Sequence, residues 1–231
     1  MPSPEYRSNA YRLLKGTGLE IGALHQPAPV PAAAVVHYFD AVPETEAARL
    51  FPELDPRQIV HVDYFGDLDR DGLAQFAGGT FDFVIINHVL EHLSNPVKAV
   101  REVFRIIRPG GCAVIAIPDK RYTYDRLRAE TSFEHLWDDY LNATQENSDE
   151  HYLDFLRSAG AHVFAEPASS LPHHIKRCRE RREHAHVWTS ASFRDFLGRA
   201  FPPLSIQATC LYEAAGEETQ MEYFSLWQKL G

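Results

Sequence analysis

The segment from Phe81 to Pro118 constrains the fold more than any other part of this 231-residue chain. It opens with the run FDFVIIN, which is apolar on both faces, as expected of a central parallel strand covered by helices on each side. An amphipathic helix and a second apolar run, CAVIAIP, follow. Two buried strands joined by a helix form a right-handed crossover, so this segment predicts a parallel sheet.

The helix between these two strands carries clear start and stop signals. Ser94 or Asn95 can cap it, and Pro96 takes the first helical position, where its missing N–H costs nothing. The run 109–111, Pro-Gly-Gly, is expected to end it. Its apolar stripe at helical spacing comprises Val97, Val100, Phe104 and Ile107.

The N-terminal half of the chain shows the same alternation. Strands are expected over residues 17–22, 34–39 and 58–63. Helices are expected over 44–51 and around 71–77. These elements supply the remaining parallel strands and crossovers.

The pattern changes after Pro118. Residues 119–186 are mostly polar with interspersed aromatic residues, and they show no clear strand pattern. This segment is therefore expected to be helical. A helix capped by Thr189 follows, and then two strands over 204–213 and 221–230. Because a short acidic turn joins these last two strands, they are expected to be antiparallel.

We therefore predict an α/β fold with a doubly wound, mostly parallel sheet of seven strands and one antiparallel terminal hairpin. The chain, 1–231, is expected to be a single domain. Its helical insertion, 119–186, follows the fifth strand and is expected to cap the substrate site.

Composition narrows the functional classes. The net charge of −9 and the pI near 5.7 argue against a nucleic-acid partner, whose phosphates favour a basic surface. No segment approaches about 18 consecutive apolar residues, and the N-terminus lacks the apolar region of a signal peptide, so no membrane insertion is expected. Three widely spaced cysteines suit a reducing compartment, which favours the cytoplasm.

The loop in the stretch Gly18–Pro31 lacks the glycines of a dinucleotide site. Such sites use G-x-G-x-x-G because a pyrophosphate must approach bare backbone at a helix N-terminus. In this loop Gly22 is the one glycine of that motif that is present. Pro27, Pro29 and Pro31 have no backbone N–H, so the loop also has fewer hydrogen-bond donors. A pyrophosphate would be held poorly, whereas a nucleoside without phosphates would not be affected.

An acidic residue closes the next strand. Asp40 lies 20 residues after Glu20 (40 − 20), where an acid can accept hydrogen bonds from ribose hydroxyls. An acid at a strand end is also a common turn residue. Together, Asp40 and the glycine-poor loop favour S-adenosylmethionine, which has an adenosine and a methionine tail but no phosphate.

Four stretches resemble the motif series of class I S-adenosylmethionine-dependent methyltransferases: LEIG, YFD, FDFVIINHVLEHLSNP and IRPGGCAVIAIPDKRYTYD. The stretches IPDKRYTYD and HAHVWTSASF further resemble a bacterial subgroup associated with glycosyltransferases and cell-surface polysaccharide assembly. The resemblance covers 18–123 and the tail from His184, and it fails in the glycine-poor loop. It implies a Rossmann-like methyltransferase fold with S-adenosylmethionine as cofactor.

The cofactor contacts that the resemblance implies come from loops at the carboxyl ends of the strands, where open α/β sheets bind ligands. They are Glu20 and Gly22 at the methionine end, Asp40 at the ribose, Asp67 or else Asp63 at the adenine amino group, and Asn87 and His88 at the sulfonium.

Methyl transfer needs alignment above all, and a hydroxyl acceptor also needs a base, for which histidine is best suited. We predict His88, Asp119 and His186 as catalytic residues. Packing is the alternative for His88 and His92, and capping the next turn for Asp119. His184 and His186 alternate and would share one face of extended chain. Two histidines without a placed carboxylate make a weak metal site, so none is predicted.

The insertion has two further features with open interpretations. The basic run 173–184 could be a solvated helix face or a clamp for an anionic acceptor, such as a phosphorylated sugar. The aromatic residues could form the insertion's own core or stack on a sugar: Phe133, Trp137, Tyr140, Tyr152 and Phe155.

The sequence thus predicts a methyltransferase that uses S-adenosylmethionine and acts, through oxygen, on a sugar or another small polar acceptor. Two alternatives stay open: a non-catalytic methyltransferase-like binding domain, and a nicotinamide-dependent reductase. The missing glycines and the antiparallel hairpin speak against the reductase, but a fold alone does not decide function. The oligomeric state is not predicted.

Overall fold

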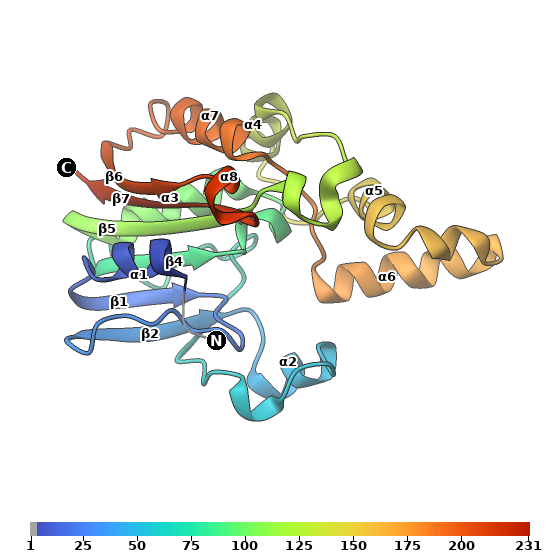
Figure 1. The fold of residues 1–231 in the computed structure, drawn as a ribbon, viewed down its shortest axis with the longest axis horizontal. Coiled ribbons are helices and arrows are strands. Elements are labelled where there is room, and N and C mark those ends of the chain that lie inside the picture. Colours follow the sequence, from blue (N-terminus) through green and yellow to red (C-terminus); the bar gives the residue numbers. More distant parts are fainter. Residues whose placement is uncertain (1–3) are drawn as a thin grey trace.

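The computed structural model describes residues 4–231, and its centre is a twisted sheet with helices on both faces (Figure 1). The strand order is β3-β2-β1-β4-β5-β7-β6; β7 is antiparallel to β5 and β6, and the other pairs are parallel. The strands are β1 (Gly16–Ile21), β2 (Ala34–Asp40), β3 (Tyr64–Phe65), β4 (Phe81–Asn87), β5 (Ile107–Pro118), β6 (Ala208–Ala214) and β7 (Glu222–Lys229). The predicted fold class is confirmed.

The α-helices are α1 (Glu5–Tyr11), α2 (Glu44–Leu50), α3 (Pro96–Ile106), α4 (Phe133–Leu141), α5 (Asp149–Ala159), α6 (Leu171–Arg181), α7 (Ser190–Ala200) and α8 (Gly216–Thr219). Short 3-10 helices include η2 (Leu90–His92), which directly follows β4 in the chain, and η3 (Lys120–Tyr122), which follows β5. In the described part of the chain, no helix combines the length and apolar character needed to cross a membrane.

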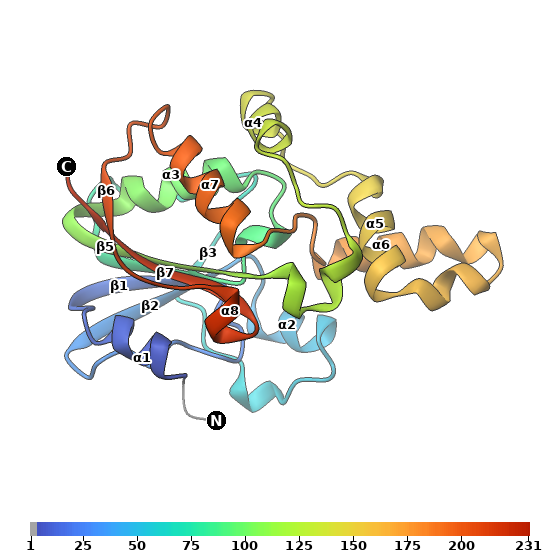
Figure 2. The ribbon, with the colours of Figure 1, turned by 45° about the horizontal axis from the view of Figure 1, so that its top comes forward.

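Two apolar layers hold the sheet. Helices α3 and α7 cover one face, and α1 covers the other (Figure 2). The side chains of β4 alternate between the layers, with Ile86 in the first and Ile85 in the second. This explains why FDFVIIN is apolar on both faces. Helix α1, which the sequence pattern did not predict, contributes Ala10 and Tyr11 to the second layer.

Helix α3 begins where the sequence predicts. The side chain of Asn95 accepts a hydrogen bond from the Lys98 amide at 2.9 Å, so Asn95 is the cap. The carboxylate of Asp69 accepts from the Ser94 and Asn95 amides, each at 3.0 Å, and fixes the approach to the helix. The helix ends at Ile106, and β5 starts with the next residue, before the predicted stop.

Two predicted elements are wrong. Residues 58–63 form no strand, and the edge strand is the two-residue β3. The apolar run passes along the edge of β2 with isolated contacts, since the Asp63 amide donates to the Tyr38 carbonyl at 2.9 Å. Residues 71–77 form turns, in which Gly72 has φ +61°, a left-handed conformation that interrupts a helix.

The insertion is helical, as predicted, and α5 and α6 extend beyond the side of the sheet where β1 ends (Figure 1). Its aromatic residues divide between two cores. Tyr152 and Phe155 form a separate small core with Cys178, whereas Phe133, Trp137 and Tyr140 of α4 pack against the main core.

Candidate active site

A cavity of about 250 Å³ opens beyond the carboxyl ends of β1, β2 and β4. Gly22, Asp40 and His88 line it, one from the end of each strand. Phe51 after α2 and Arg182 after α6 enclose it from the opposite side. A neighbouring cavity of about 320 Å³ shares several lining residues with the first; those are Val42, Leu50, His92, Glu180 and Arg182.

Gly22 lets the backbone approach this cavity closely. Its φ is +69°, and a Cβ atom at this position would lie 2.6 Å from Cγ2 of Val89. Its N–H donates to the Phe39 carbonyl at 3.0 Å. A side chain here would therefore strain the backbone and displace Val89.

The loop after Gly22 uses its amides internally. The Ala28 N–H lies 3.0 Å from both carboxylate oxygens of Glu20, and the Gln26 N–H donates to the Ala23 carbonyl at 2.9 Å. Glu20 is almost fully buried, and burial raises its pKa to about 7 against the opposing effects of Ala28 and Arg7. Its carboxylate is not part of the cavity lining. The arrangement offers little for a pyrophosphate, as the sequence indicates.

Of the predicted acids, Asp40 alone lines the first cavity. Its Oδ1 accepts from the Ala41 amide at 2.7 Å, and burial raises its pKa. Asp67 lines the neighbouring cavity and forms an ion pair with Arg182. Asp63 lies outside both linings and accepts from the Tyr38 amide at 2.8 Å.

His88 is held by a residue that the sequence analysis did not identify. It has φ +54°, and its Nε2 lies 2.5 Å from Oε2 of Glu222, the fully buried first residue of β7. Arg7 and Tyr6 of α1 also donate to this carboxylate. Burial would lower the pKa of His88, but the hydrogen bond to Glu222 and the negative charges of Glu91 and Glu222 together outweigh it and raise the pKa. The same contacts lower the pKa of Glu222 to about 2, against the opposing effect of burial.

Asn87 points toward α1. Its Nδ2 donates to the Tyr11 hydroxyl at 2.9 Å, and its side chain is absent from the cavity lining. No sequence signal marks these contacts, because α1 and β7 lie far from β4 along the chain.

The carboxylate of Asp119 is bound by neighbouring residues of the protein itself. It is fully buried, and its Oδ2 accepts from both the amide and the hydroxyl of Ser190, at 2.8 and 2.7 Å. The guanidinium of Arg121 binds the same carboxylate. Burial would raise the pKa of Asp119, but these hydrogen bonds outweigh it and lower the pKa to about 2. An acid so engaged is poorly placed to accept a proton from substrate, which favours the capping alternative.

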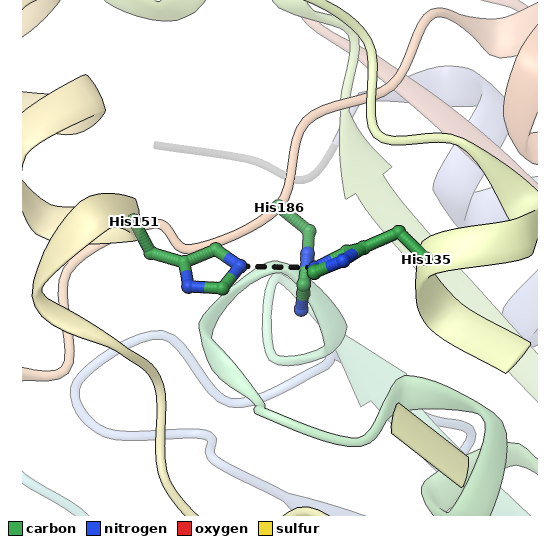
Figure 3. A group of neighbouring side chains, drawn as sticks. All are labelled: His135, His151 and His186. Carbon is green, nitrogen blue, oxygen red and sulfur yellow. Dashed lines mark hydrogen bonds between the residues drawn. The ribbon is translucent and has the colours of Figure 1, made fainter. Parts of the chain in front are cut away.

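His186 lies apart from the cavity, in a group with His135 and His151 (Figure 3). It is nearly fully buried, and neither ring nitrogen has a hydrogen-bond partner. Burial, with the charges of the other two histidines, lowers its pKa well below the usual value. His184 turns to a different group and pairs with Asp125, with Nδ1 and Oδ2 2.6 Å apart. The expectation that His184 and His186 share one face is wrong, because their side chains belong to different groups.

Three arginines of the basic run 173–184 form ion pairs with the chain's own acids. Arg179 pairs with Asp149, and Arg181 pairs with Glu53 at 2.6 Å. Arg181, and Arg182 through its ion pair with Asp67, fasten the insertion to the rest of the molecule, whereas the pair of Arg179 and Asp149 lies within the insertion. Lys176 and Arg177 line a further cavity of about 300 Å³ together with Arg49, so the clamp interpretation stays a prediction for that part of the run.

Comparison with known proteins agrees with this geometry. Residues 16–115 match the model of a methyltransferase domain. One similar solved structure is a Rhodobacter sphaeroides protein that is provisionally described as a Zn-dependent alcohol dehydrogenase. The alignment has a TM-score of 0.61 at 13% identity and covers 100% of this chain and 92% of that protein. Another is the complex between the Haloferax volcanii Trm112 methyltransferase activator and a protein provisionally described as a methyltransferase. The alignment has a TM-score of 0.51 at 12% identity and covers 98% of this chain and 89% of the matched chain.

The chain spans only part of some of the structures that it matches. The alignment with the CurJ carbon methyltransferase covers 94% of this chain and 49% of that protein, with a TM-score of 0.47 at 15% identity. No curated protein sequence matches the chain. At these identities the structural likeness establishes the fold, and the domain match adds support for a class I methyltransferase that uses S-adenosylmethionine.

Proposed function

We propose, from the methyltransferase domain that residues 16–115 match, that the chain transfers a methyl group from S-adenosylmethionine to a hydroxyl of a small, sugar-like acceptor. The observation that carries this proposal is the convergence of Gly22, Asp40 and His88 on one cavity at the ends of three parallel strands. The neighbouring loop, whose amides are used internally, adds support for a nucleoside without phosphates.

The proposed roles follow from the chemistry of each group. When bound, S-adenosylmethionine supplies an electrophilic methyl group. Asp40 accepts hydrogen bonds from the ribose hydroxyls, and Gly22 leaves room for the ligand beside the backbone. His88 takes the proton of the acceptor hydroxyl through Nδ1, because Glu222 holds Nε2. Asp67, in the neighbouring cavity, binds the adenine amino group.

Calorimetric titration of the protein with S-adenosylmethionine, S-adenosylhomocysteine and NADH tests the cofactor. We expect heat for the first two, and Asp40→Asn should weaken their binding about ten-fold or more, since hydrogen bonds to charged groups contribute roughly 1.5–3 kcal/mol. Asp195→Asn, an exposed acid on α7, is the matched control. Heat with NADH alone would favour the reductase alternative.

Mass spectrometry across a panel of nucleotide sugars and other hydroxylated compounds tests the reaction. We expect one acceptor class to gain a methyl group at oxygen. Cofactor binding without methyl transfer to any compound in the panel would favour the non-catalytic binding domain.

A further inference from the structure

Glu91 in η2 is a buried acid whose carboxylate lacks hydrogen-bond partners within the described part of the chain. It is 1% exposed, yet neither carboxylate oxygen has a hydrogen-bond partner. A buried carboxylate without hydrogen-bond partners is costly, and a bound cation is one partner that would compensate its charge. The backbone carbonyl of Glu91 accepts from the Ala185 and His186 amides, which brings the 184–186 segment against η2.

Histidine nitrogens surround this carboxylate. Nε2 of His92 lies 3.8 Å from Oε1 of Glu91, and Nε2 of His184 lies 3.9 Å from it. Nδ1 of His88 lies 3.6 Å from the same oxygen. The ligand atoms of Glu91, His92 and His184 all lie within 4.8 Å of one another.

The outer nitrogens of two of these rings are bound by acceptors. Nδ1 of His92 donates to the Arg182 carbonyl, and Nδ1 of His184 donates to the carboxylate of Asp125 at 2.6 Å. These bonds leave Nε2 of each ring unprotonated, as metal-binding histidines require. The Tyr124 hydroxyl, 3.0 Å from Nε2 of His184, would have to turn aside.

We propose that Glu91, His92 and His184 bind a divalent first-row transition metal such as Zn²⁺, with His88 beside it. Two imidazoles and one carboxylate are a common donor set for these ions and leave a coordination position open. The positive charge of the ion would compensate the buried carboxylate. Small side-chain movements would bring the donors to the ~2.0–2.2 Å that zinc requires.

The group of His135, His151 and His186 is a weaker candidate. Nε2 of His135 and Nε2 of His151 lie 3.1 Å apart and can satisfy each other, and His135 also contacts Asp139 at 3.3 Å. It lies away from the cavity of Gly22 and Asp40 and serves as an internal control.

The metal site also has a consequence that rests on the proposed function. His92 and His88 line the cavity proposed for the cofactor, whereas Glu91 and His184 do not, so a bound ion would lie behind the cavity wall next to His88.

Titration of the metal-free full-length protein with Co²⁺, followed by visible absorption, and with Zn²⁺, followed by calorimetry, tests the site. We expect one ion per chain, at least about a ten-fold loss of affinity in Glu91→Gln, and wild-type affinity in His151→Ala. The metal-dependent rise in Tm should be the same in the wild type and in His151→Ala and smaller in Glu91→Gln at the same metal concentration. Circular dichroism of the metal-free variants checks that each folds.

Wild-type affinity in Glu91→Gln, loss of binding in His151→Ala alone, or no stoichiometric binding by the wild type would overturn the proposal. Because binding of S-adenosylhomocysteine is measured separately, failure of the metal site and failure of the proposed function can be told apart.

Discussion

His88 depends for its orientation on a carboxylate from the far end of the chain. Glu222 is 134 residues away in sequence, yet its Oε2 lies 2.5 Å from Nε2 of His88. The ionised carboxylate stabilises the imidazolium and fixes which ring nitrogen carries the proton. Without Glu222, His88 would be a half-buried histidine with no fixed tautomer.

This contact predicts a change in pH dependence. A histidine base acts when deprotonated, so kcat/KM should rise with pH through the pKa of His88, which lies above the usual 6.5. In Glu222→Gln the imidazolium loses its partner, and the rising limb should move to lower pH. Glu217→Gln, an exposed acid nearby on α8, is the control. Superimposable profiles of the Glu222→Gln variant and the wild type would exclude His88 as the base.

The loop between β1 and β2 is organised around a buried acid. Glu20 and the Ala28 amide bind each other across a turn that contains Pro27, so the prolines shape the loop as well as removing donors. This arrangement holds the loop that follows Gly22 against β1. Because the carboxyl group of Glu20 is buried, its ionisation lowers the stability of the folded protein.

Glu20→Gln should therefore stabilise the protein at high pH. The folded-state pKa is about 7 against 4.5 unfolded, so the wild type loses stability as pH rises through this window. At about pH 8 the variant should be more stable by roughly 2–3 kcal/mol, and the difference should shrink toward about pH 4. Urea unfolding at both pH values measures it, with the exposed Glu150→Gln as control. An equal gain at both pH values would contradict the assignment.

The insertion is tied to the sheet where it leaves and where it returns. Asp119 forms a parallel bridge with Trp188, and the Lys120 amide donates to the Trp188 carbonyl at 2.8 Å. The carboxylate of Asp119 binds Ser190 at the start of α7. The helices between these points therefore leave the sheet and return to it at one place, and ion pairs of Arg181 and Arg182 add contacts further out.

Loss of this connection should destabilise the whole molecule. Because the pKa of Asp119 is about 2 against 3.8 unfolded, its contribution is present above about pH 4 and is lost as pH falls toward 2. Asp119→Asn should cost about 2 kcal/mol at neutral pH and less in acid, measured by urea unfolding. Reduced methyl transfer with unchanged stability would instead support the catalytic role that the sequence analysis gave it.

Local sequence determined the β4–α3–β5 unit, a cap at Ser94 or Asn95, the Thr189 cap and the placement of Gly22 and Asp40 at strand ends. Apolar periodicity, capping and chain direction depend on neighbouring residues, so they can be read without the fold. Tertiary structure decided the conformation of residues 58–63, because strand formation at a sheet edge depends on pairing as well as on apolar character. It also brought Glu222 to His88 and His184 to Glu91. Contacts between residues about a hundred positions apart leave no local pattern, since they arise only when separate strands and loops meet at one edge of the sheet.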